Sequence, residues 1–171
     1  AEADPWQVIP TTWVRLAQER WAERDRPKTP LTSVGVDPAR GGRDKTAIAK
    51  RYDNWFDEII SYPGVDTPDG PTVAALVKQN LETDPLLVNI DVIGIGASAY
   101  DSLRPMYQNV NPVNVASKSE YRDKTGKLKM RNVRAEYHWR MRDALDPVHG
   151  DDIALPPGSE IVADLCIARY K

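Results

Sequence analysis

Two aspartates each end a short apolar run, and they are the residues of this chain best placed to do chemistry. Asp37 follows residues 33–36, and Asp91 follows residues 86–90. Apolar runs of this length predict buried strands, and a carboxylate beside one costs free energy unless a cation or a hydrogen-bond donor meets it. Two such carboxylates facing one point would form an oxygen-rich site suited to Mg²⁺ or Mn²⁺. The alternative is that each aspartate only closes a turn, since Pro38 follows the first and a glycine-rich loop follows the second.

The composition is that of an ordinary globular protein. The chain has 171 residues, of which 41% are hydrophobic and 28% are charged, and its formal net charge is −2. We expect a single domain with a short appendage, large enough to bury a core. The single cysteine, Cys166, excludes a disulfide within the chain and a cysteine-based zinc site. No apolar run is long enough for a membrane span and no signal-peptide pattern opens the chain, so we expect a cytoplasmic protein.

A basic segment, residues 118–134, departs from the acidic balance of the whole chain. It holds seven basic and two acidic residues, a local net charge of +5. Gly126, between Tyr121 and Met130, favours a turn and so an extended hairpin. Basic side chains on such a hairpin would bind phosphate groups, although a run of charges is also typical of a plain solvated surface. The DNA-binding candidates are Lys118, Arg122, Lys124, Lys127, Lys129 and Arg131, with Arg40 and Lys45 close to Asp37 in the sequence.

The expected elements follow from periodicity and from turn residues. A helix over residues 11–24 is ended by the two prolines of residues 25–30. Three strands come next, and Asp53-Asn54 supplies a tight turn between the last two. Helices and strands then alternate, and Asn132 is the expected N-cap of the helix after the basic segment. The expected strands cover residues 33–37, 46–52, 55–61, 86–91, 111–116 and 152–156, and the later helices cover residues 72–82, 96–107, 132–146 and 158–170.

Three antiparallel strands followed by helix, strand, helix and strand is the order of a ribonuclease H-like fold. We therefore expect an α/β architecture, with a mixed sheet flanked by helices and with the basic hairpin as an insertion. In this fold the ends of the first and fourth strands lie side by side, and those are the ends that carry Asp37 and Asp91 in this sequence. Their matching positions favour a shared metal site over two separate turns.

Three stretches together resemble the nuclease domain of the large terminase subunit of tailed double-stranded DNA bacteriophages. They are "VGVDPARGGRDKTAIAKRYDNWF", "VNIDVIGIGASAYDSLR" and "NVRAEYHWRMRDALDP". The resemblance extends from Leu31 to Tyr170 and rests on the order of the motifs, since no single motif is diagnostic. It implies that residues 31–171 are a ribonuclease H-like nuclease domain lacking its C-terminal end. It also implies that residues 1–30 hold a linker helix from a preceding packaging ATPase domain.

The resemblance further implies roles for individual acidic residues. Asp37 and Asp91 would be catalytic metal ligands in a two-ion site for Mg²⁺ or Mn²⁺, and Asp44 would be an accessory acid near the metal. The family's third metal-binding aspartate lies after the last helix, in a segment that this chain does not contain before it ends at Lys171. No third protein ligand is found, because none of the late aspartates has the expected context: Asp151, Asp152 and Asp164.

The implied function is a metal-dependent endonuclease that cuts concatemeric double-stranded DNA during viral genome packaging, in the cytoplasm of the infected or lysogenic bacterial host. The implied partners are double-stranded DNA, the ATPase domain of the same polypeptide, the small terminase subunit and the portal, with no membrane. One alternative is a non-catalytic DNA-binding or motor-docking module of the same fold. Another is a resolvase or integrase, whose third acid on the last helix would be Glu160 or Asp164. The two histidines, His138 and His149, are expected to be structural.

Overall fold

The computed structural model describes residues 4–39 and 41–169, which form two compact units. The sheet unit comprises the described residues from 26 to 114, and the helical unit comprises the described residues up to 25 together with those from 115 onward. Within the described part of the chain, no helix is both long enough and apolar enough to cross a membrane.

A mixed sheet forms the frame of the sheet unit. Its described strands are β1 (Ser33–Asp37), β2 (Lys45–Tyr52), β3 (Trp55–Phe56), β4 (Ile60–Pro63), β5 (Leu87–Asp91) and β6 (Val110–Val113). They lie in the order β3-β2-β1-β5-β6, and β4 also pairs with β2. β1 runs antiparallel to β2 and parallel to β5, and β5 runs parallel to β6. This arrangement confirms the expected ribonuclease H-like α/β fold, in which β1 lies beside the strand that ends at Asp91.

The third expected strand is divided into β3 and β4 by a β-bulge. Phe56 pairs with Arg51 and Ile60 pairs with Ile48, so three residues of one strand stand opposite two of the other. Asp57 lies within the bulge, and its N–H still donates to the β2 backbone at 2.9 Å. An extra residue of this kind bends a strand locally without changing its apolar character. The expected single strand over residues 55–61 was therefore wrong in its continuity, although its pairing partner is as predicted.

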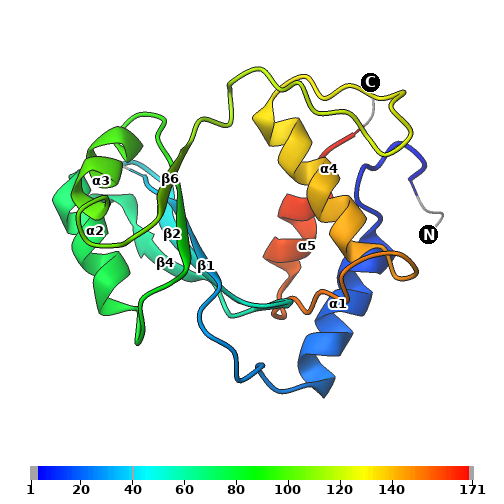
Figure 1. The fold of residues 1–171 in the computed structure, drawn as a ribbon, viewed down its shortest axis with the longest axis horizontal. Helices are drawn as coiled ribbons and strands as arrows, with labels where there is room; N and C mark the ends of the chain where they lie inside the picture. Colours follow the sequence, from blue (N-terminus) through cyan, green and yellow to red (C-terminus); the bar gives the residue numbers. More distant parts are fainter. Residues whose placement is uncertain (1–3, 40, 170–171) are drawn as a thin grey trace. The chain divides into compact units, whose positions relative to one another are not determined.

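One face of the sheet carries the core of this unit. Alternate residues of the central strands are buried there: Val34, Val36, Ile48, Val88 and Ile90. The face is covered by α2 (Gly70–Gln79) and α3 (Gly96–Leu103), which lie on the same side of the strands in Figure 1. The hydroxyl of Tyr62 in β4 accepts from Asn80, at the end of α2, at 2.7 Å. Because side chains alternate along a strand, the opposite face carries small and polar residues: Gly35, Ala47, Ala49 and Asn89.

Local sequence determines where these two helices begin and end. Asp69 caps α2, since its Oδ1 accepts from the Thr72 N–H at 2.8 Å. Gly70 lets α2 approach α3 closely, because a Cβ at this position would lie 2.3 Å from the backbone of Ser98. α3 is shorter than the expected residues 96–107, because Pro105 has no N–H with which to continue the helical hydrogen bonds.

The helical unit contains α1 (Thr11–Glu23), α4 (Val133–Leu145) and α5 (Ser159–Leu165). The expected strand over residues 152–156 is instead an extended segment that binds the side of α1. The Leu155 N–H donates to the Ala17 carbonyl at 3.1 Å, and the Ile153 carbonyl accepts from Arg20 Nε at 2.8 Å. Only Ala154 of this segment is in a β-bridge, and its neighbours bind α1, so the predicted strand over residues 152–156 does not form.

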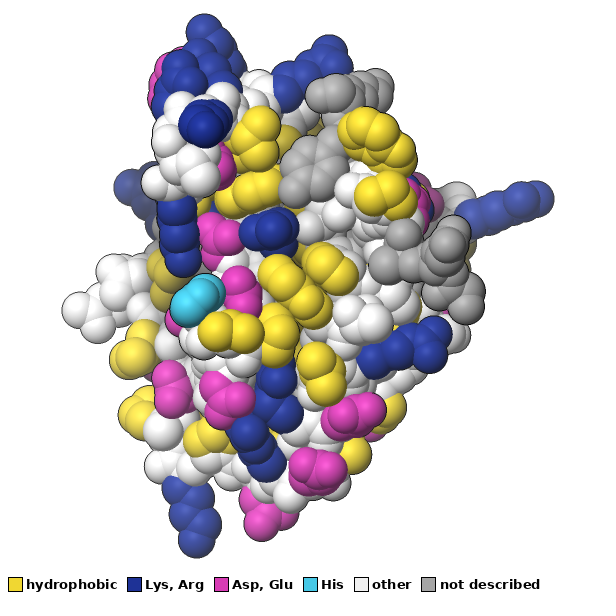
Figure 2. Space-filling model, turned by 90° about the vertical axis from the view of Figure 1, so that its right-hand side faces the viewer, with side chains coloured by type: hydrophobic (Ala, Val, Ile, Leu, Met, Phe, Trp, Pro, Cys, Tyr) yellow, Lys and Arg dark blue, Asp and Glu magenta, His cyan; other side chains and the backbone are white. Residues whose placement is uncertain are grey.

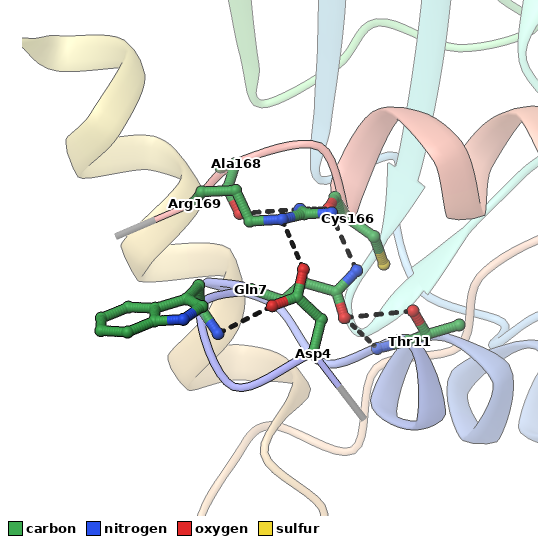
Figure 3. Close-up of polar contacts among 7 residues, drawn as sticks. Asp4, Gln7, Thr11, Cys166, Ala168 and Arg169 are labelled. Carbon is green, nitrogen blue, oxygen red and sulfur yellow. Dashed lines mark hydrogen bonds and ion pairs between the residues drawn. The ribbon is translucent and has the colours of Figure 1, made fainter. Parts of the chain in front are cut away.

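The last described residues lie along the first ones. Gln7 forms an antiparallel bridge with Arg169, and its Nε2 donates to the Cys166 carbonyl at 3.1 Å. Figure 3 shows the hydrogen bond from Gln7 to Cys166 together with the ion pair between Arg169 Nε and the Asp4 carboxylate, at 2.7 Å. The contacts hold the chain after α5 in an extended conformation, which is why α5 is shorter than the expected helix over residues 158–170.

Candidate functional site

Asp37 and Asp91 end neighbouring parallel strands at the same edge of the sheet. β1 and β5 pair with Val36 opposite Ile90, so the next residue on each strand is an aspartate, and neighbouring strands lie about 4.8 Å apart. Val36 and Ile90 are buried, whereas Asp37 is exposed and Asp91 is half-buried. Because successive side chains alternate, both aspartates lie on the face opposite α2 and α3. The sheet thus places the two side by side, and their role as metal ligands stays a prediction.

The turn after β5 uses one oxygen of the second aspartate. Asp91 Oδ1 accepts from the Ile93 N–H at 2.9 Å. This hydrogen bond forms an Asx-turn, which was the alternative role for Asp91 in the sequence analysis. Gly96 lies against the same turn, since a Cβ on it would lie 1.8 Å from the Asp91 carbonyl oxygen. The position of Asp91 is therefore fixed by a turn and by a glycine, while Oδ2 takes no part in the turn.

A cavity of about 420 Å³ opens at the end of β1. Asp37, Asp44 and Lys45 line one part of it, and residues 93–95 of the turn after β5 line another. The structure thus brings Asp44 and Lys45, both predicted near the metal, around one cavity with Asp37. Asp91 itself does not line the cavity but begins the turn that does. Arg40, the other residue predicted here, lies outside the described residues.

Two buried threonines anchor the loop between Asp37 and Asp44. The Ala39 N–H donates to Thr46 Oγ1 at 2.9 Å, and Thr67 Oγ1 donates to the Ala39 carbonyl at 2.7 Å. The two hydroxyl oxygens lie 2.8 Å apart and share a hydrogen bond, and both residues are completely buried. Both backbone polar groups of Ala39 therefore have buried partners, which fixes the chain soon after Asp37. The prediction from sequence missed these positioning residues, and the one signal was a threonine just before the apolar residues 47–49 of β2.

The donor set fits one divalent cation. Among the described residues, no group of three or more histidine, cysteine, aspartate or glutamate side chains could hold a metal ion. Mg²⁺ needs fewer protein ligands, because it is commonly held by one or two carboxylates and completed by water and substrate phosphate. Asp37 and Asp91 provide such a pair. Asp152 is engaged elsewhere, since a hydrogen bond from Arg24 lowers its pKa and Arg20 lies 3.6 Å away.

The basic segment forms the predicted hairpin in the helical unit. Lys118 bridges antiparallel to Asn132, and Arg122 bridges antiparallel to Lys129. Gly126 forms the turn with a left-handed φ of 73°. All six DNA-binding candidates of this segment are exposed. Two of them have an acidic neighbour, because Glu120 lies 3.5 Å from Lys118 and 3.3 Å from Lys129. Their contact with DNA stays a prediction.

The base of the hairpin is fastened to α4 through one glutamate. Glu136 Oε2 accepts from the Ser119 hydroxyl at 2.7 Å, and Oε1 accepts from Arg140 Nε at 2.9 Å. These hydrogen bonds, first that from Ser119 and then that from Arg140, lower the pKa of Glu136. The Arg140 guanidinium also stacks on the Tyr121 ring, 4.3 Å from its centroid. The ionised Glu136 carboxylate therefore links Ser119 at the base of the hairpin to Arg140 on α4.

Glu136→Gln is expected to destabilise the fold by about 1 kcal/mol at neutral pH, because hydrogen bonds to a charged acceptor are worth more than neutral ones. The pKa of Glu136 is lowered in the folded state, so its contribution is complete above the unfolded-state pKa and is lost as pH falls through the folded-state pKa. The difference between wild type and variant should therefore shrink in acid. Urea unfolding at about pH 7 and about pH 3 measures it. The control is Glu160→Gln on α5, which should not show this pH-dependent difference.

Comparisons with known proteins bear on the fold. No model of a protein family matches this chain, and no curated protein matches it in sequence. A point variant of gp2c of the large terminase subunit from bacteriophage Sf6, solved with calcium, matches with a TM-score of 0.69 and 17% identity, over 96% of this chain and 83% of that one.

Two further solved structures are also similar in fold to this chain. The nuclease domain of the large terminase subunit of bacterial virus Sf6 matches with a TM-score of 0.67 and 17% identity, over 93% of this chain and 80% of that one. A variant of that domain with manganese and beta-thujaplicinol gives a TM-score of 0.66 and 16% identity over the same shares of each chain, 93% and 80%. The structural resemblance expected from the three motifs is confirmed: this chain has the fold of the nuclease domain of a phage large terminase subunit.

Proposed function

We propose that this chain is the nuclease domain of a viral DNA-packaging terminase, a metal-dependent endonuclease that hydrolyses phosphodiester bonds of concatemeric double-stranded DNA. The observation that carries the proposal is the pair of aspartates at the ends of β1 and β5, beside a cavity that Asp44 and Lys45 also line. Solved nuclease domains of similar fold, some of them holding calcium or manganese, support it.

Each residue at this edge of the sheet has a distinct task in the proposal. Asp37 and Asp91 would hold a divalent cation through carboxylate oxygens, and a second ion would need a third protein ligand. Bound Mg²⁺ or Mn²⁺ would supply an activated water and would neutralise the charge that develops on the phosphate. Asp44 and Lys45 line the cavity, where Asp44 would accept a hydrogen bond from water and Lys45 would offer a cation to the DNA backbone. Thr46 and Thr67 keep the intervening loop in place.

The test is nicking of supercoiled plasmid DNA by this chain, or by a longer polypeptide that contains it. We expect nicking and linearisation with little sequence preference in Mg²⁺ or Mn²⁺, no reaction in excess EDTA, and recovery when metal is restored. The 171-residue chain by itself is expected to be weakly active or inactive if the third ligand is missing. Cleavage that persists in EDTA would contradict the proposal.

The hairpin is the proposed grip on DNA. Carboxylates at the metal site repel phosphate, so cations must offset them, and Lys124 and Lys127 are exposed and form no ion pair with a described residue. Replacing Lys124, Lys127 and Lys129 together by alanine should weaken DNA binding similarly for every sequence. The slope of log affinity against log salt should flatten by roughly 0.9 for each lost phosphate contact. Fluorescence anisotropy with a labelled duplex at several salt concentrations measures both.

A matched control separates this effect from a general loss of charge. Arg15, Lys28 and Lys78 are exposed and lie outside the hairpin, and replacing all three by alanine removes the same formal charge. We expect the salt slope to stay unchanged in this control and Mn²⁺ binding to stay unchanged in both triple variants. Equal losses of affinity in the two would show that the hairpin makes no particular contact.

A non-catalytic DNA-binding or motor-docking module is the second candidate. It is favoured by the engagement of Asp91 Oδ1 in a turn. It is also favoured by the absence, among the described residues, of a group of three or more histidine, cysteine, aspartate or glutamate side chains that could hold a metal ion. Under either proposal the partners are double-stranded DNA, the packaging ATPase domain of the same polypeptide, the small terminase subunit and the portal. The setting is then the cytoplasm of the bacterial host. Metal binding separates the two, because a docking module has no use for adjacent carboxylates.

A further inference from the structure

A second cavity, of about 550 Å³, lies in the helical unit and takes no part in the proposed nuclease chemistry. Its walls come from the second half of the hairpin, the first turns of α4 and the segment after α5. Figure 2 shows a face of the protein on which hydrophobic side chains lie among lysines, arginines and acidic residues.

The floor of this cleft is apolar. Trp139, Met130 and Val8 line it and are 7%, 7% and 9% exposed. At its rim, Leu128 and Ile167 are 41% and 72% exposed, which is high for large hydrophobic side chains. Apolar side chains gathered around a concave surface mark a binding site more often than scattered ones do. The cleft is therefore shaped to receive a bulky apolar side chain.

The charged side chains that line the cleft all have one sign. Lys129, Arg131, Arg134 and Arg169 line it, and no carboxylate does among the described residues. Lys129 and Arg169 already have acidic partners, Glu120 at 3.3 Å and Asp4 at 2.7 Å. Arg131 and Arg134 form no ion pair with any described residue, and both are exposed. The cleft thus has two arginines that can bind acidic groups without giving up an existing partner.

We propose that this cleft binds an acidic peptide segment of a partner protein, with one bulky apolar side chain in the cleft and carboxylates on Arg131 and Arg134. Arginine pairs are well suited to carboxylates because the guanidinium offers parallel N–H groups. A peptide fits better than a DNA duplex, because phosphates would satisfy the arginines but leave the apolar floor without a partner. This site is separate from the proposed metal site and does not depend on it.

The experiment selects the ligand from a library. Random twelve-residue peptides displayed on phage are selected on the immobilised chain in EDTA, so that failure of the metal chemistry cannot affect the result. The selected sequences are then synthesised with a fluorescein label and measured by anisotropy. We expect them to converge on acidic residues flanking a large apolar residue.

Three variants locate the binding. Arg131→Glu with Arg134→Glu should weaken peptide binding by about tenfold or more, because it places like charges opposite the ligand. Ala135→Trp, which fills the cleft without changing charge, should do the same. The control is Arg15→Glu with Arg104→Glu, which makes the same charge change at two exposed arginines outside the cleft and should leave affinity within about twofold. Circular dichroism checks that each variant is folded.

Other outcomes would overturn the proposal. Peptides that fail to converge, or that bind the arginine variant and Ala135→Trp as well as they bind wild type, exclude an acidic peptide site. If a labelled DNA duplex loses affinity in both variants and the peptides do not, the cleft belongs to a nucleic-acid surface. If the chain sediments as a dimer that Ala135→Trp dissociates, the occupant is a second copy of the chain.

Discussion

Asp37→Asn and Asp91→Asn are each expected to lower metal-dependent DNA cleavage by about a thousandfold, because a catalytic metal supplies several kcal/mol of transition-state stabilisation. Asparagine keeps the shape of the side chain but removes the charge that holds the cation. In Asp91→Asn the side-chain carbonyl oxygen can still accept from the Ile93 N–H, so the turn is retained. Plasmid nicking in Mn²⁺ measures the rate, and thermal unfolding checks that both variants stay folded.

Calorimetric titration with Mn²⁺ tests the same pair without cleavage. We expect wild-type binding to be weak, with one ion bound if the third ligand is missing, and to be abolished in either variant. Asp101→Asn, an exposed aspartate on α3, is the matched control and should bind as wild type does. An unchanged titration in Asp37→Asn would remove the metal assignment, and robust cleavage by either variant would refute the two-aspartate mechanism.

Gly96→Ala is expected to destabilise the chain by about 3 kcal/mol, a large effect for one methyl group. The added Cβ would lie 1.8 Å from the Asp91 carbonyl oxygen and 2.7 Å from its carbonyl carbon, so the start of α3 and the end of β5 must move apart. Because Asp91 moves with that backbone, metal affinity should fall along with stability. Urea unfolding gives the free energy, and Mn²⁺ titration at a temperature where the variant is folded gives the affinity.

Gly35→Ala is the matched control, since it adds the same methyl group two residues before Asp37. Nothing lies within 4 Å of a Cβ at this position, and its backbone is ordinary strand. We expect a change in the free energy of unfolding within about 1 kcal/mol, in either direction. Equal destabilisation by the two substitutions would mean that the contact between Gly96 and the Asp91 carbonyl is not what matters.

The parts of the fold that could be predicted are those fixed by local pattern. The runs that end at Asp37 and Asp91 are apolar and bounded by turn residues, so both strands and their final carboxylates follow from sequence. Asn132 caps α4 as expected, with its side chain accepting from the Ala135 N–H at 2.9 Å. The hairpin could be predicted because Gly126 favours a turn between the two extended stretches that contain Tyr121 and Met130. Each of these depends on neighbours a few residues away.

What could not be predicted depends on contacts between distant residues. The bulge between β3 and β4 depends on how this stretch pairs with β2, and the short apolar run at residues 55–61 does not show where an extra residue is inserted. Thr46 and Thr67 are 21 residues apart in the sequence and form a hydrogen bond in the fold. The local sequence around either threonine does not indicate this contact. The cleft in the helical unit needs the hairpin, α4 and the segment after α5 to meet. Its arginines could be identified as basic from sequence, but the apolar floor between them could not.

The hydroxyl pair beneath the loop has a consequence for how that loop moves. The shortest links form a closed circuit from the Ala39 N–H through the Thr46 and Thr67 hydroxyls to the Ala39 carbonyl. Both hydroxyls are completely buried, and each has a second, longer acceptor: the Ala39 carbonyl for Thr46 at 3.2 Å and the Gly64 carbonyl for Thr67 at 3.3 Å. Exposing Ala39 to water therefore means separating several buried hydrogen-bonding groups at once. The Ala39 amide proton should then exchange with solvent as slowly as those of β2, and not at the rate of a surface loop. Asp44 is held by a separate contact, since its carbonyl accepts from the Gly64 N–H at 3.0 Å, so both ends of the loop are anchored to the same part of the chain.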